Sequence, residues 1–177
     1  MNESAKTLSD SLTRQYNTRN PFRIARMLDI TIKYINTKRQ KGFCKIIDGY
    51  AFIFINQNLS EQMQRMTCAH ELGHILLHKD LLEERQYLLE YELFDIQNQT
   101  EYEANVFAAN LLIDEEELYE SMRNGADMVS AASALDVNVN LLMIKLIEMQ
   151  KEGKELTVPF FPNHQFMGKI RDSADSI

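Results

Sequence analysis

The stretch Thr67-Cys-Ala-His-Glu-Leu-Gly-His-Ile-Leu-Leu-His78 decides how this sequence is interpreted. His70 and His74 are four residues apart, so on a helix they lie one turn apart on the same face and can hold one metal ion together. Glu71 then lies beside the ion, where a carboxylate can take a proton from a metal-bound water and deliver it to a leaving group. The pattern indicates a zinc centre built for hydrolysis, with Glu71 as the catalytic base.

The surrounding residues predict that this stretch is helical. Ser60 is a favourable N-cap, Glu61 lies in the first turn, and up to His78 only Gly73 interrupts the helix-forming residues. This context favours a metal site over a chance match. His78 is one turn beyond His74 and too far along the helix to share the same ion, so we expect it to interact with the last carbonyls of the helix.

A third protein ligand is expected downstream, because a catalytic zinc commonly takes three protein ligands and leaves one position open. The segment Glu101-Tyr-Glu-Ala-Asn105 contains two carboxylates. Glu101 lies on the apolar stripe of its predicted helix and is the expected ligand, whereas Glu103 is the alternative and can form a capping box with Thr100. Asn105 is expected to hydrogen-bond the other ring nitrogen of a histidine ligand. Candidates for stabilising a tetrahedral oxyanion are Tyr91, Tyr102, Tyr119 and His164.

The length and composition are those of one soluble globular domain. The chain has 177 residues, of which 45% are hydrophobic and 25% charged. No apolar run approaches the roughly 18 residues of a spanning helix, and residues 1–10 lack a signal-peptide core, so we expect a cytoplasmic protein with no membrane contact. Cys44 and Cys68 form no disulfide framework and are interpreted as buried thiols.

The pattern of apolar residues predicts an α+β fold. Helices are expected at residues 4–16 and after Asn20-Pro21, an alternating strand at 30–35, and a hairpin of 43–47 with 50–55 around Asp48-Gly49. We therefore predict a small, mostly antiparallel sheet packed against a zincin-type helix, followed by a helical C-terminal part.

The expected single domain spans 1–177 and divides into four parts. These are N-terminal helices (1–29), a sheet and metal-site core (30–112), C-terminal helices (113–152) and a tail (153–177) that packs on the body and then frays. Helices are predicted at 101–112, 115–122, 127–135 and 138–151, and residues 79–99 are either partly helical or a flap over a cleft.

The distribution of charge disfavours nucleic acid as a partner. Residues 127–150 look like a helix-turn-helix, but they contain Lys145 against Asp127, Asp136 and Glu148, whereas DNA binding needs basic side chains. We expect these helices to pack on the core. The first 45 residues carry a charge of +7 and the remaining 132 carry −14. We interpret this basic segment as solvated surface rather than as a docking surface.

The histidine motif and the later Glu101-Tyr-Glu-Ala-Asn-Val-Phe-Ala-Ala-Asn-Leu-Leu112 together resemble the ImmA/IrrE metallopeptidase family. Upstream stretches resemble it as well: Arg19-Asn-Pro-Phe-Arg-Ile-Ala, Lys41-Gly-Phe and Ile53-Phe-Ile-Asn-Gln-Asn-Leu-Ser60. The likeness covers roughly residues 15–150. Two positions depart from it: Asp114 replaces the usual proline, and Cys68 stands where an aliphatic residue is common.

The resemblance implies a cytoplasmic zinc protease, often encoded on phages or integrative elements, that cleaves a helix-turn-helix repressor. It assigns one Zn²⁺ per chain to His70, His74 and Glu101, with Glu71 catalytic. The alternative is a metal-containing regulator that sequesters its repressor without cutting it. The presence of Glu71 favours turnover, because a pure binding protein needs no base beside its metal.

Overall fold

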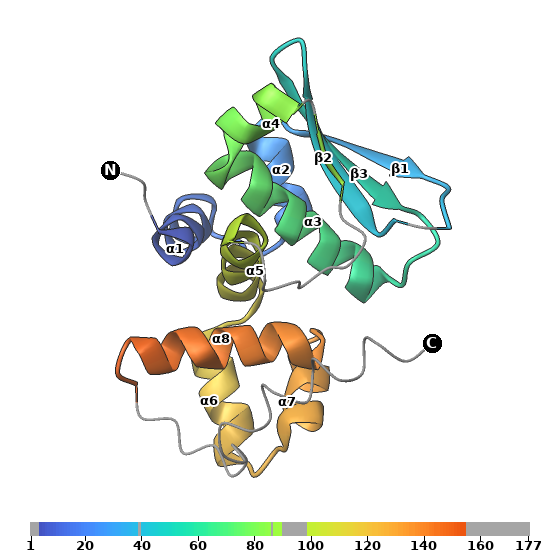
Figure 1. The fold of residues 1–177 in the computed structure, drawn as a ribbon. Helices are drawn as coiled ribbons and strands as arrows, with labels where there is room; N and C mark the ends of the chain where they lie inside the picture. The colour runs from blue at the N-terminus through green and yellow to red at the C-terminus, as the bar shows by residue number, and fades with distance from the viewer. Residues whose placement is uncertain (1–3, 39, 86, 90–98, 155–177) are drawn as a thin grey trace.

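The computed structural model describes residues 4–38, 40–85, 87–89 and 99–154. The predicted α+β class is confirmed: helices α1 to α5 lie on one side of a small sheet, and α6 to α8 form a helical part next to α5 (Figure 1).

The two N-terminal helices begin where their capping residues predict. Helix α1 (Ala5–Tyr16) is capped by Ser4, whose hydroxyl accepts from the Thr7 N–H. Helix α2 (Pro21–Met27) is capped by Asn20, and its proline occupies the first turn, where no N–H is needed. These helices contribute the buried residues Leu12, Ile24 and Ala25 to the core.

The sheet has the strand order β1-β3-β2-β4 in the described part of the chain. Its strands are β1 (Thr31–Ile35), β2 (Gly42–Ile47), β3 (Tyr50–Asn56) and β4 (Tyr87–Leu89). Strand β2 pairs antiparallel with β3 and β4, whereas β1 pairs parallel with β3, so the sheet is mostly antiparallel. The predicted hairpin turns at Asp48 and Gly49, which have φ angles of 52° and 81°. Both angles are positive, as tight hairpin turns require.

The central helix α3 (Glu61–Leu77) lies between the sheet and α5 (Gln99–Leu112). Ser60 caps α3 as expected, and alternate strand residues Cys44, Ile53 and Ile55 are fully buried. Segment 79–99 contains α4 (Lys79–Arg85) and β4, while residues 86 and 90–98 of the suggested flap lie outside the described residues. The predicted capping box of Thr100 with Glu103 is wrong, because α5 begins at Gln99 and Thr100 is therefore inside the helix.

The C-terminal helices are α6 (Glu115–Arg123), α7 (Met128–Ala134) and α8 (Val139–Lys151). Asp114, Asp127 and Asn138 cap them through side-chain oxygens. Helix α8 packs on α5 and buries residues around much of its circumference: Leu141, Leu142, Ile144, Lys145, Leu146 and Met149. The second helix of the helix-turn-helix-like segment therefore packs on the core, as expected.

The described helices are short compared with a membrane-spanning helix. None of them is long and apolar enough by itself to cross a bilayer. Helices α7 and α8 meet the requirement of length and composition only as a pair, with a bend of 101° between them.

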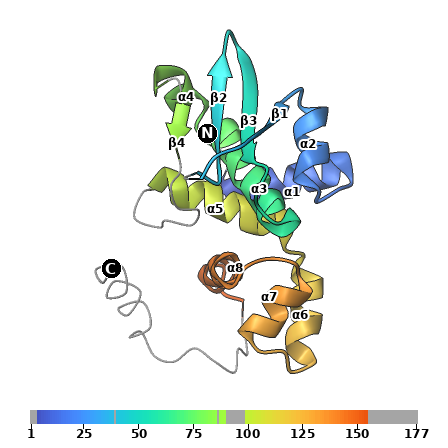
Figure 2. The same cartoon turned by 90° about the vertical axis from the view of Figure 1, so that its right-hand side faces the viewer.

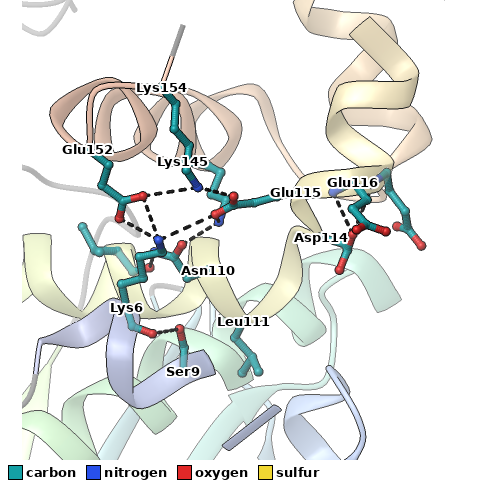
Figure 3. Close-up of polar contacts among 12 residues, drawn as sticks. Lys6, Ser9, Asn110, Leu111, Asp114, Glu115, Glu116, Lys145, Glu152 and Lys154 are labelled. Carbon is teal, nitrogen blue, oxygen red and sulfur yellow. Dashed lines mark hydrogen bonds and ion pairs between the residues drawn. The ribbon is translucent and has the colours of Figure 1, made fainter. Parts of the chain in front are cut away.

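A network of charged side chains joins α1, α5, α6 and α8 (Figure 3). Lys145 is buried, and its ammonium donates to Asn110 Oδ1 at 2.6 Å and to Glu115 Oε1 at 2.9 Å. Glu115 also pairs with Lys154, and Lys6 pairs with Glu152 at 2.7 Å. Burial raises the pKa of Glu115, but hydrogen bonds from Lys154 and Lys145 outweigh it and lower this pKa to about 2.

Asp114 explains how the chain replaces the proline expected between α5 and α6. Its side chain accepts from the backbone N–H groups of Glu116 and Glu117 and so starts α6. It also forms an ion pair of 2.7 Å with Arg19, which donates to the Asn110 carbonyl as well. The junction is held by side-chain hydrogen bonds instead of a rigid ring.

Candidate metal centre

Helix α3 brings the two motif histidines together in the interior. His70, Glu71 and His74 have no exposed surface, and the Nε2 atoms of the two histidines lie 3.1 Å apart. This is the arrangement predicted from their four-residue spacing on one helical face.

Gly73 lets α5 approach this part of α3. A Cβ at Gly73 would lie 3.1 Å from Phe107 Cδ1 and 3.2 Å from Ala104 Cα, tighter than about nine in ten real Cβ contacts. A hydrogen at this position thus permits the close crossing of α3 and α5. From the sequence, Gly73 is only a tolerated interruption of the helix, so this role was not predicted.

The crossing brings Glu101 to the histidines. Its Oε2 lies 3.3 Å from His70 Nε2, and its Oε1 lies 3.3 Å from His74 Nε2. Burial raises the pKa of Glu101, but hydrogen bonds with the two histidines outweigh it and lower this pKa to about 2. The carboxylate is therefore charged at neutral pH.

Glu103 lies on another side of α5. One of its oxygens accepts from Gln99 Nε2 at 2.9 Å, and the other is 3.7 Å from His78 Nε2. Its side chain is 40% exposed, compared with 16% for Glu101. Of the two carboxylates left open by the sequence, only Glu101 faces both motif histidines.

The three side chains have the dimensions of a tetrahedral metal site. Zinc bonds of about 2.0–2.1 Å at tetrahedral angles separate ligand atoms by about 3.3–3.4 Å, close to the 3.1 and 3.3 Å separations here. Two imidazoles and one carboxylate are also a common donor set for catalytic zinc. Within the described residues, this is the one cluster of potential metal ligands found. His70, His74 and Glu101 therefore fit a zinc ion.

Glu71 is enclosed beside this cluster. Both of its carboxylate oxygens are buried and have no hydrogen-bond partner within the described residues. Burial raises the pKa of Glu71, and nearby His70 and His74 oppose the rise. A buried carboxylate with a raised pKa beside a metal site is suited to accept a proton from a bound water.

Strand β2 approaches Glu71 at Gly42. A Cβ at Gly42 would collide with Thr67 Cγ2 and would lie 2.8 Å from the Phe54 carbonyl oxygen and 3.5 Å from Glu71 Oε1. Any larger residue would therefore displace β2 from α3. The only signal for this role in the sequence was the resemblance of Lys41-Gly-Phe to the ImmA/IrrE family, which did not predict that Gly42 lies against Glu71.

The two cysteines beside the site are buried thiols, as the sequence predicts. Cys44 and Cys68 have no exposed surface and form no disulfide. Burial, followed by the negative charge of Glu71, raises the pKa of both thiols, so neither is an activated nucleophile.

Comparison with known proteins agrees with this geometry. The model of the family described as IrrE N-terminal-like domain, Peptidase_M78, matches residues 25–146. The chain belongs to this peptidase family. It is also 33% identical over 109 residues to a protein of Bacillus phage phi105 described as "Uncharacterized immunity region protein 2". That alignment covers 61% of this chain and 67% of the phage protein. The ImmA/IrrE resemblance is thus confirmed.

Other predicted members of the site occupy different places in this IrrE N-terminal-like domain. Asn105 is buried, but its amide makes no hydrogen bond within the described residues, so its predicted bond to a histidine is wrong. His78 is the C-cap of α3 and its backbone N–H donates to the His74 carbonyl oxygen, as expected, while its ring nitrogen lies 3.0 Å from the Thr100 carbonyl oxygen and links the end of α3 to α5. It lies outside the metal cluster.

Neither Tyr102 nor Tyr119, the two oxyanion candidates that the structure describes, is brought to the site. Tyr102 donates to Glu148 at 2.6 Å and accepts from Lys151 at 2.9 Å, so its hydroxyl is directed toward α8. Tyr119 lies on α6 in the C-terminal part. Tyr91, His164 and the tail from residue 155 onward lie outside the described residues.

Proposed function

We propose that this chain is a zinc-dependent, site-specific endopeptidase that cleaves a helix-turn-helix repressor of a phage or mobile element. The observation that carries the proposal is the convergence of His70, His74 and Glu101 beside the buried carboxylate of Glu71. The peptidase family and the phage immunity-region relative support it.

The proposed chemistry divides between the metal and the chain. His70, His74 and Glu101 would hold one zinc ion, which supplies a Lewis acid for the scissile carbonyl and lowers the pKa of a bound water to about 7. Glu71 takes the proton of the attacking water on a carboxylate oxygen and delivers it to the leaving amine nitrogen. Enclosure by α3 and β2 keeps other water away from Glu71, which strengthens this proton transfer.

Two further features belong to the proposal. The chain acts as one peptidase domain, because α8 packs on the same helix that carries Glu101. Its place of action is the cytoplasm, where a DNA-binding repressor is found. The acidic balance of residues 46–177 suits a partner that carries the basic charge of a DNA-binding protein.

The test is incubation of the purified chain with the repressor encoded beside its gene, followed by intact mass measurement. Discrete fragments are expected with the unaltered protein and with the control Glu103→Gln, and none with Glu71→Gln, which should retain zinc. Full cleavage by zinc-loaded Glu71→Gln would overturn the mechanism. A stable complex without fragments would favour sequestration of the repressor.

A further inference from the structure

Strand β1 is the last strand on one side of the sheet. It pairs with β3 over Thr31 to Ile35, and its other edge pairs with no strand in the described part of the chain. Figure 2 places α2 on this side of the sheet. Between α2 and β1 is a groove of about 530 Å³, lined by Phe22, Arg26, Asp29, Ile30, Thr31, Ile32 and Tyr34.

The groove has the two walls that an added strand needs. An unpaired strand edge presents a row of backbone N–H and C=O groups, which can form a ladder with an extended peptide. The wall opposite β1 is α2, whose side chains Phe22 and Arg26 reach into the groove. A peptide lying along β1 would therefore form backbone bonds to the strand and side-chain contacts with the helix.

Apolar side chains in and beside the groove remain in contact with water. Tyr34 is 52% exposed and Met27 is 47% exposed, and these are two of only five large hydrophobic residues so exposed within the described residues. Phe22 and Ile32 are partly buried in the groove. Because alternate residues of a strand point to one side, a peptide with an apolar residue at every second position would cover these side chains.

The charge around the groove favours acidic residues at the remaining positions of the peptide. Helix α2, strand β1 and the connection between them carry three basic residues, Arg23, Arg26 and Lys33, and one acidic residue, Asp29. Arg23 and Arg26 are exposed on α2, and Lys33 is exposed on β1. An acidic residue on the groove side would lie close to Arg26, and acidic residues between the apolar ones would lie on the face that carries Lys33. Both contacts would increase affinity and speed the encounter.

We propose that β1 and α2 form a docking groove for an extended, acidic and apolar segment of a partner protein, which adds a strand to the sheet. The groove lies at the edge opposite β4, and β3 separates β1 from β2, whose Gly42 contacts the Glu71 region. Docking therefore requires neither zinc nor Glu71 and is independent of the proposed peptidase activity.

The test uses a fluorescent peptide of alternating residues, acetyl-Asp-Val-Glu-Ile-Asp-Val-Glu-Ile-amide, and a twin in which Lys and Arg replace Asp and Glu. Anisotropy should show saturable binding of the acidic peptide, and amide NMR shifts should concentrate at β1 and α2. Tyr34→Ser and Arg26→Glu should each weaken binding about tenfold. The matched controls Tyr50→Ser and Arg123→Glu, at exposed positions elsewhere, should bind as the unaltered protein does.

Several results would overturn the docking groove. These are absence of saturable binding, equal binding of the basic twin, or shifts that concentrate at β2 and α3. A dimer that Tyr34→Ser dissociates would assign the edge to a second copy of this chain instead. Glu71→Gln separates the two proposals, because it should bind the acidic peptide normally while failing to cleave a repressor.

Discussion

Glu115 and Lys145 should respond very differently to substitution, although they form one ion pair. Glu115→Gln leaves a buried ammonium opposite a neutral amide, and breaking a buried pair in this way costs about 3–5 kcal/mol. Because the Glu115 side chain is 28% exposed, water screens part of this loss, and we expect about 2–3 kcal/mol. Lys145→Met removes the buried charge itself and fills the same space, so its expected cost is about 1 kcal/mol.

Urea unfolding at pH 7, followed by circular dichroism, measures both changes. Glu115→Gln should also lower Tm by about 5–10 °C in a chain of this size. The control is Glu116→Gln, the exposed neighbour in the same helical turn, which should change stability by less than about 0.5 kcal/mol. A larger loss for Lys145→Met than for Glu115→Gln would refute the reasoning.

Other perturbations should separate stability from metal binding. The pKa of Glu115 is lowered from its ordinary 4.5 to about 2, so this carboxylate stabilises the folded chain above pH 4.5 and loses that effect as the pH falls toward 2. The expected loss is about 1–2 kcal/mol after solvent screening, and urea unfolding at several pH values across this range measures it. Glu101→Gln should weaken zinc binding at least about tenfold in a competitive chelator titration, whereas Glu103→Gln should not. Gly73→Ala should weaken zinc binding, because the added methyl group separates α3 from α5. The higher helix propensity of alanine offsets about 1 kcal/mol of the accompanying loss of stability. An unchanged zinc affinity would contradict the close crossing of the two helices. Gly42→Ala should lower thermal stability, because its methyl group collides with Thr67.

Local signals in the sequence predicted the elements that carry the site. Ser60 and the helix-forming run after it, interrupted only by Gly73, predicted the limits of α3, and the Asp48-Gly49 turn predicted the β2–β3 hairpin. Helical spacing also favoured Glu101 over Glu103, and the structure places Glu101 toward the histidines. Each of these depends on residues within a few turns of one another.

Features that depend on distant segments were not predictable from local patterns. The parallel pairing of β1 with β3 depends on how the chain connects them, since alternation is the same in parallel and antiparallel strands. The role of Gly73 depends on Ala104 and Phe107 of another helix. Asn105 shares the expected face of α5, but its orientation depends on neighbours that helical spacing does not specify.

The placement of α5 has a consequence for the order in which the protein becomes competent during synthesis. The chain contains all four residues of the metal centre once Glu101 has been made, but α5 then lacks the cover that α8 provides as far as Met149. A nascent or prematurely terminated chain would expose apolar residues of α5 and hold Glu101 on a poorly anchored helix. The proposed peptide hydrolysis should therefore begin only after nearly all of the described chain has left the ribosome, so that fragments of the chain would not cleave other proteins.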